Sequence, residues 1–134
     1  AYTPEAFAEV LAINVTGVFL TIKAALPALR RAKGKIAIIS SQMGSSERAN
    51  GGGYIYRASK AAATNLACNL AKDLAPEGIA VGAYHPGWVQ TDMGGDAAAI
   101  TPEQSAAGLV QRFDALGPKT TGCFEMWNGE AMPY

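Results

Sequence analysis

The sequence predicts an α/β fold with a parallel sheet, in the order helix, strand, helix, strand, helix, strand. Two continuous apolar runs, residues 35–41 and 79–85, are typical of strands that are covered on both faces. Between them, the alanine-rich segment 56–75 has helical spacing and ends before Pro76 and Gly78. Because parallel strands are joined by right-handed crossovers, both strand ends and the start of this helix should meet at one rim of the sheet.

The first helix is predicted over residues 4–31. Thr3 can cap its N-terminus, Pro4 suits its first turn, and a basic run followed by Gly34 ends it. Its apolar side chains cover most of the circumference, which predicts a helix buried on more than one side. Pro27 is expected to bend this helix or to close its main body.

Two further elements complete the pattern. Thr101 begins a third helix that extends to about Leu116, and residues 122–127 form a last short strand. The alanine-rich faces of the helix 56–75 permit close approach of another helix.

Composition restricts the function classes. The 134 residues suffice for one domain, and 11 basic side chains balance 11 acidic ones without a basic run, which disfavours nucleic-acid binding. The longest uncharged apolar run, residues 10–22, is too short to span a bilayer, and no signal peptide is recognised, so no membrane partner is expected. Cys68 and Cys123 form no CxxC pair and indicate reduced, buried thiols in a cytoplasmic protein.

Tyr56 and Lys60 are the residues best spaced for chemistry. Four residues apart on a helix, they share a face with Cβ atoms about 6 Å apart, whereas Tyr54 points elsewhere. A cation held near a phenol stabilises the phenolate and lowers a pKa that is ordinarily about 10. Taken by itself, the spacing favours the simpler interpretation, an aromatic at a helix start followed by an ordinary lysine.

Four segments in this order resemble the short-chain dehydrogenase/reductase family: INVTGVF (13–19), ISSQMGS (39–45), YRASKAA (56–62) and HPGWVQTDMGG (85–95). With GCFEMWNGE near the end, they are most similar to its carbonyl-reductase branch, which includes the Sniffer and C-factor proteins. The resemblance implies a doubly wound, Rossmann-type sheet of which residues 1–134 form the C-terminal catalytic half. The family's glycine-rich turn and Asn-Asn-Ala-Gly signature are not found, so the N-terminal cofactor-binding half is expected to be absent.

The resemblance also implies catalytic roles for four residues. Tyr56 would be the acid/base and would also contact the cofactor, and Lys60 would lower the pKa of Tyr56 and bind the nicotinamide ribose. Ser41 would hold the substrate oxygen, although a serine that only ends a strand is the structural alternative. Asn14 would anchor a water that links Lys60 to solvent; in so apolar a helix, an asparagine without a partner costs about 1–3 kcal/mol.

The implied cofactor is NADP or NAD. The resemblance assigns the turn Pro86-Gly87, the backbone of Val89 and the side chain of Thr91 to contacts with the nicotinamide carboxamide and a nearby phosphate. Pro-Gly after a buried strand is also simply a sharp turn. The glycines 51–53 could instead cradle a phosphate at a helix N-terminus, but no GxGxxG pattern accompanies them.

The substrate is expected to be a small carbonyl compound or alcohol, and an apolar aldehyde or ketone is the family-level expectation. Met43, Trp88 and Met93 flank the motif residues and either line an apolar substrate pocket or belong to ordinary packing. His85, the only histidine, has no metal-ligand partners at suitable spacing and is expected to cap the strand end.

The family commonly pairs two helices with their copies in a partner subunit. A homo-oligomer through helices 4–31 and 56–75 is therefore expected. The alternative to a reductase is a truncated, catalytically inactive relic that folds by associating with itself.

Overall fold

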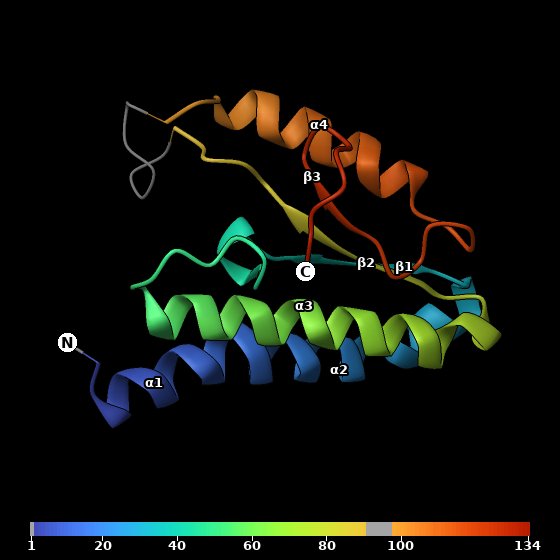
Figure 1. The fold of residues 1–134 in the computed structure, drawn as a ribbon. Helices are drawn as coiled ribbons and strands as arrows, with labels where there is room; N and C mark the ends of the chain where they lie inside the picture. The colour runs from blue at the N-terminus through green and yellow to red at the C-terminus, as the bar shows by residue number, and fades with distance from the viewer. Residues whose placement is uncertain (1, 91–97) are drawn as a thin grey trace.

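The computed structural model describes residues 2–90 and 98–134, and shows a three-stranded parallel sheet with helices on both faces (Figure 1). The strands β1 (Lys35–Ile39), β2 (Ala80–His85) and β3 (Phe124–Met126) are ordered β1-β2-β3 in the sheet. Lys35 lies opposite Ala80 in the first pair, and Ala83 lies opposite Phe124 in the second. The predicted parallel α/β fold is confirmed.

The predicted first helix consists of three continuous segments: α1 (Pro4–Leu11), the π-helical turn η1 (Ala12–Thr16) and α2 (Gly17–Ala32). The Thr3 hydroxyl accepts a hydrogen bond from the amide of Ala6 at 3.1 Å, as the capping pattern predicted. Pro27 lies inside α2, so the expectation that it closes the main body of the helix is wrong. The helix instead continues to Ala32 and is capped by Lys33, whose φ of 48° is left-handed.

The helix α3 (Tyr54–Leu74) begins two residues earlier than predicted and continues into the 3₁₀ turn η3 (Ala75–Glu77). The three preceding glycines, Gly51–Gly53, all have positive φ, so the run is required for a left-handed approach to the helix. The last helix, α4 (Pro102–Ala115), has a capping box in which the side chains of Thr101 and Gln104 bond to each other's backbone amides.

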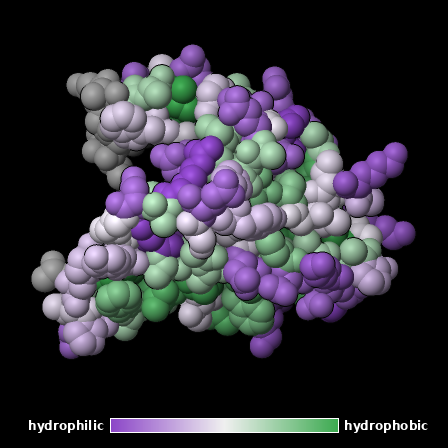
Figure 2. Space-filling view, in the orientation of Figure 1, coloured by the Kyte–Doolittle hydropathy of each residue, from purple (hydrophilic) through white to green (hydrophobic). Residues whose placement is uncertain are grey.

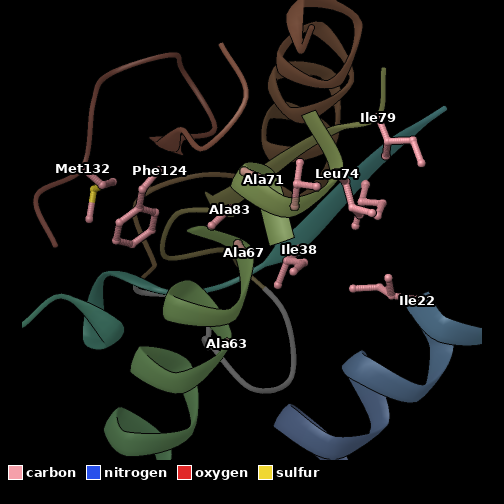
Figure 3. Packing of buried hydrophobic residues seen from close by; sticks show 12 residues of the cluster. Ile22, Ile38, Ala63, Ala67, Ala71, Leu74, Ile79, Ala83, Phe124 and Met132 are labelled. Carbon is pink, nitrogen blue, oxygen red and sulfur yellow. The ribbon is translucent and has the colours of Figure 1, made fainter. Parts of the chain in front are cut away.

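The core lies on both faces of β2, as its six buried residues indicate. On one face, Val81, Ala83 and Ile38 pack against α2 and α3 (Figure 3). The residues that α3 contributes to this cluster include Ala67 and Leu74. The small side chains of α3 allow its backbone to lie close to the sheet. On the other face, Ala80 and Tyr84 pack with Leu116 beneath α4.

Two burial predictions are wrong. β1 alternates between exposed and buried residues, and Ile39 is 44 % exposed, because β1 is an edge strand of this sheet and has only one face covered by the core. The first helix is not buried on several sides either: Ile13 is 65 % exposed and Leu20 54 %, because α1 and α2 contact the rest of the described chain on one side only. Figure 2 shows apolar residues at the surface along its lower side, where α1 and α2 lie.

The helical stretch Pro4–Ala32 is longer than the apolar run considered from the sequence. By length and composition it could cross a membrane: its best 18-residue window has a mean hydropathy of 1.7, and 6 % of that window is buried. A core helix of a soluble protein passes the same test. In the structure, Val18, Ile22 and Leu26 pack against the core.

Cys68 and Cys123 are both free thiols. Each is half-buried rather than fully buried as expected.

Candidate active site

A cavity of about 490 Å³ lies at the carboxyl ends of β1 and β2. Three separate segments line it: Ser40, Ser41, Gln42 and Met43 after β1; Tyr56 on α3; and His85, Pro86, Gly87, Trp88 and Val89 at the end of β2. The structure thus brings together eight of the residues singled out in the sequence: Ser41, Met43, Tyr56, His85, Pro86, Gly87, Trp88 and Val89. Thr91 and Met93 lie outside the described residues.

Ser41 is placed by the short 3₁₀ turn η2 (Gln42–Gly44), which follows β1. Its hydroxyl accepts a hydrogen bond from the amide of Met43 at 3.1 Å and so caps this turn. The turn lies directly on the backbone of α3, because a Cβ at Gly44 would be 2.7 Å from the carbonyl carbon of Lys60. Only glycine fits there, and this close contact brings Ser41 to the same cavity as Tyr56.

Ser40, the residue before Ser41, also links the end of β1 to α3 through hydrogen bonds. Its hydroxyl lies 2.6 Å from that of Thr64 and 3.3 Å from the carbonyl oxygen of Lys60, both on α3. Buried hydroxyls of this kind are stabilising because each polar atom has a partner.

Lys60 lies beside the aromatic ring of Tyr56, with Nζ 5.7 Å from the ring centroid. Nζ also donates a hydrogen bond of 3.1 Å to the carbonyl oxygen of Ile39, the last residue of β1. Burial lowers the pKa of the Lys60 ammonium below its ordinary value. Tyr54, by contrast, packs against Tyr2 with ring centroids 5.0 Å apart and does not line the cavity.

Asn14 lies in the π-helical turn η1 and its partner is a side chain of α3. Its Nδ2 donates to the hydroxyl of Ser59 at 3.1 Å, and that hydroxyl donates to the carbonyl oxygen of Tyr56 at 2.8 Å. The asparagine is therefore satisfied, as its apolar surroundings required. Sequence reasoning missed the fully buried Ser59. The signal available was a small polar residue one helical turn after Tyr56.

His85 is the last residue of β2 and forms part of the cavity wall. Its side chain is buried, and Nδ1 has no hydrogen-bond partner among the described residues. Burial, with a smaller contribution from the positive charge of Arg48, lowers the pKa of His85 to about 4. The imidazole is therefore neutral at pH 7.

The loop after β2 is held in one conformation by residues on its far side. Gly87 has a φ of 89°, and a Cβ there would lie 2.6 Å from the side chain of Ile100. The hydroxyl of Ser105 donates to the carbonyl oxygen of Pro86 at 2.6 Å, and the backbone N–H of Gln90 donates to the carbonyl oxygen of Ile100 at 2.8 Å. The sharp turn expected from Pro-Gly is present, and it directs Val89 to the cavity.

Comparison with known proteins gives consistent matches. The family model described as short chain dehydrogenase matches residues 1–100. C-signal of Myxococcus xanthus is 39 % identical over 129 residues, which cover 95 % of this chain and 78 % of that protein. The 1-hydroxy-2-glutathionyl-2-methyl-3-butene dehydrogenase of Rhodococcus sp. (strain AD45) is 41 % identical over 127 residues, 91 % of this chain and 56 % of that protein.

Solved structures agree over the whole chain. Carbonyl reductase Sniffer of D. melanogaster has a TM-score of 0.95 and 33 % identity, and the NADPH-bound carbonyl reductase from chicken fatty liver has a TM-score of 0.92 and 32 % identity. The matched region is 59 % of each of those chains, so the present chain spans little more than half their length. The cavity, its lining and these matches lead to one conclusion: the chain belongs to the short-chain dehydrogenase family.

Proposed function

We propose that residues 1–134 are the C-terminal catalytic half of an NAD(P)-dependent oxidoreductase of the carbonyl reductase or alcohol dehydrogenase type. The observation that carries this proposal is the shared cavity of Ser41 and Tyr56, with Lys60 against the Tyr56 ring. The coarser assignment, a family of oxidoreductases, rests on dehydrogenase relatives and carbonyl reductase structures. The cofactor-binding half is proposed to lie outside this chain.

The cavity has a composition that fits a nicotinamide and a small substrate. Its volume of about 490 Å³ is typical of small-molecule sites, and its lining combines the hydroxyl-bearing residues Ser40, Ser41 and Tyr56 with a wall of Pro86, Trp88 and Val89. Nδ1 of His85, which has no partner among residues 2–90 and 98–134, is a further buried polar atom in the cavity lining. Pro86, Gly87 and Val89, with Thr91, would hold the nicotinamide end of NADP or NAD. When bound, this cofactor supplies or accepts a hydride.

Tyr56 is the proposed acid/base, because its side chain reaches the cavity from the first turns of α3. In the reductive direction the phenol donates its proton to the substrate oxygen, which Ser41 holds by a hydrogen bond. The nearby Lys60 ammonium stabilises the resulting phenolate by Coulomb attraction, which favours release of the proton.

Asn14 is proposed to keep the acid/base supplied with protons. Its hydrogen bond to Ser59 holds η1 against α3, one helical turn after Tyr56 in the chain. A water molecule beside Asn14 would then link Lys60 to solvent. The π-helical turn supports this proposal, because such turns occur frequently at functional sites.

The test compares two tyrosines of the same helix in the full-length enzyme. Tyr56→Phe should lower turnover of an aldehyde at least about 10³-fold while leaving cofactor affinity within about twofold, because only the proton donor is removed. Tyr54→Phe is the matched control and should retain turnover, since Tyr54 packs against Tyr2 outside the cavity. Rates are followed as oxidation of NADPH and, separately, NADH. Equal activity of the two variants would contradict the assignment of Tyr56.

A second candidate is an inactive, self-associating relic. The exposed apolar residues of η1 and α2 and a cavity of about 810 Å³ between this helix and β1 favour association with another chain or segment. The mass of the native gene product separates the candidates: a product of 13.9 kDa supports the relic, and a product of roughly twice that mass supports the reductase. For the reductase we propose a cytoplasmic homo-oligomer that contacts through helices 4–31 and 56–75, without a nucleic-acid or membrane partner.

A further inference from the structure

A second, smaller cavity adjoins the catalytic one. Its volume is about 220 Å³, and it is lined by Gln42, Met43, Arg48, Asn50 and Arg57. Gln42 and Met43 also line the catalytic cavity, so these two residues form the boundary between the two spaces. A molecule bound at Ser41 and Tyr56 therefore has this polar recess next to it.

The recess contains two arginines whose hydrogen-bond partners are neutral. Arg48 donates through Nη1 to the amide oxygen of Gln42 at 3.3 Å, and Arg57 donates through Nη2 to the amide oxygen of Asn50. Neither forms an ion pair with a carboxylate in the described part of the chain. Elsewhere in that part, Arg30 and Arg112 each pair with a glutamate. The recess therefore has two positive charges and no described counter-charge.

Arg57 also has an unsatisfied donor. Its Nε is buried and has no hydrogen-bond partner among the described residues. It lies close to Met43 at the boundary, since a Cβ built on Gly53 would be 3.6 Å from this Nε and 3.1 Å from the methyl carbon of Met43. A buried donor without an acceptor is destabilising, and an anion that accepted from it would remove that penalty. A guanidinium presents its donors in a planar fork that matches a carboxylate.

The charge of Arg48 acts on the catalytic cavity as well. Besides burial, the charge of Arg48 contributes to lowering the pKa of His85, a residue of that cavity wall. The positive charge of the recess therefore acts on a residue that lines the catalytic cavity.

We propose that Arg48 and Arg57 bind a carboxylate of the substrate. This inference rests on the proposed function and narrows it: the substrate is an aldehyde or ketone with an apolar body, for the wall formed by Met43 and Trp88, and an anionic tail for the recess. The two arginines are specificity-determining residues and take no part in proton transfer.

The test uses the full-length enzyme with a matched pair of substrates, 4-carboxybenzaldehyde and methyl 4-formylbenzoate, which differ in the charge of one group. The wild type should prefer the carboxylate by about tenfold or more in kcat/KM. Arg48→Gln and Arg57→Gln should each reduce that preference about five- to tenfold through KM, with the turnover of the ester unchanged. Arg31→Gln, at an exposed arginine near the end of α2, is the control and should keep the wild-type preference.

Each outcome bears on one proposal. Turnover of both substrates without a preference, or variants that affect both substrates equally, would overturn the carboxylate site and leave the reductase in place. If the wild type reduces neither compound, the proposed function is in question, and calorimetric titration of 4-carboxybenzaldehyde decides the site separately. Binding that weakens about tenfold in Arg57→Gln but not in Arg31→Gln supports the site, whereas equal binding in both variants overturns it.

Discussion

His85 shows how a single side chain can make this protein sensitive to acid. It is buried, neutral at pH 7, and its Nδ1 has no hydrogen-bond partner in the part of the chain that the structure describes. A protonated imidazole in that position would place an uncompensated charge beside the positive Arg48. The residue therefore favours the folded state only while it remains uncharged.

The predicted consequence concerns stability in weak acid. The pKa of His85 is about 4 in the folded protein, against an ordinary value of 6.5, so the unfolded chain takes up the proton first as the pH falls. The stabilising effect is complete above pH 6.5 and is lost as the pH falls towards 4. Between pH 7 and pH 5 the free energy of unfolding should fall by about 2 kcal/mol on this account. Urea unfolding of the full-length protein at both pH values measures it, and His85→Gln should remove this part of the difference; an unchanged difference would contradict the assignment.

At the residue scale, the sequence was informative where spacing alone specifies geometry. Tyr56 and Lys60 are one helical turn apart, and the structure places the ammonium against the ring. Ser59 and Arg57 were missed because their significance depends on tertiary neighbours: Asn14 for the serine, and the adjoining recess for the arginine. In sequence, a serine among alanines and an arginine at a helix start are typical of ordinary helix surfaces.

At the scale of elements, the junction between η2 and α3 determines the site. The turn that presents Ser41 packs on the backbone of Lys60 through Gly44, and the hydroxyls of Ser40 and Thr64 bond across the same junction. The position of Ser41 relative to Tyr56 therefore depends on a contact that has no room for a side chain.

Gly44→Ala tests this dependence. The added methyl group would lie 2.7 Å from the Lys60 carbonyl carbon, so η2 must move away from α3. We expect the free energy of unfolding to fall by about 1–3 kcal/mol, with a larger relative loss in turnover than in cofactor affinity. Gly117→Ala is the control, because a Cβ there meets nothing within 4 Å and should change neither quantity. Chemical denaturation and steady-state kinetics of the full-length enzyme measure both effects, and equal stability of the two variants would show that the junction tolerates a side chain.

Most elements could be predicted because their ends have local signals. Thr3 and Thr101 cap their helices as expected, and the apolar runs became β1 and β2. The π-helical turn could not be predicted from local sequence. Asn14, which lies in this turn, forms a hydrogen bond with Ser59, a residue 45 positions away in the chain. The early start of α3 has a similar cause: Tyr54 joins the helix and packs against Tyr2.

At the scale of the whole molecule, burial was the property that the sequence predicted least well. The apolar character of α1, α2 and β1 was evident from the sequence. Their burial was inferred from composition alone, and composition does not show which other segment would pack against them. In the structure Ile13, Leu20 and Ile39 remain exposed. These surfaces are the ones from which association is expected.

An oligomer that uses the first helix can be tested with a charge on that surface. In the full-length protein, Leu20→Lys should weaken association about tenfold or more, because a lysine would be desolvated against a partner helix. Val110→Lys is the matched control: Val110 is similarly exposed, at 56 %, but lies on α4 across the sheet. Sedimentation velocity at micromolar concentration measures both variants. A wild type that sediments only as a monomer, or equal behaviour of the two variants, would contradict an interface through this helix.

The hydrogen bond between the Lys60 ammonium and the Ile39 carbonyl makes the position of this ammonium depend on the end of β1. Ile39 is the last residue of β1, an edge strand of the described sheet, so the Lys60 amine is hydrogen-bonded to a strand that has a neighbour on one side only. A segment that pairs with β1 as a further strand would therefore stabilise the position of the Lys60 amine, and local unfolding of β1 would displace it. Substitutions that weaken β1 should therefore slow the proposed proton transfer to the substrate under conditions in which the protein is still folded.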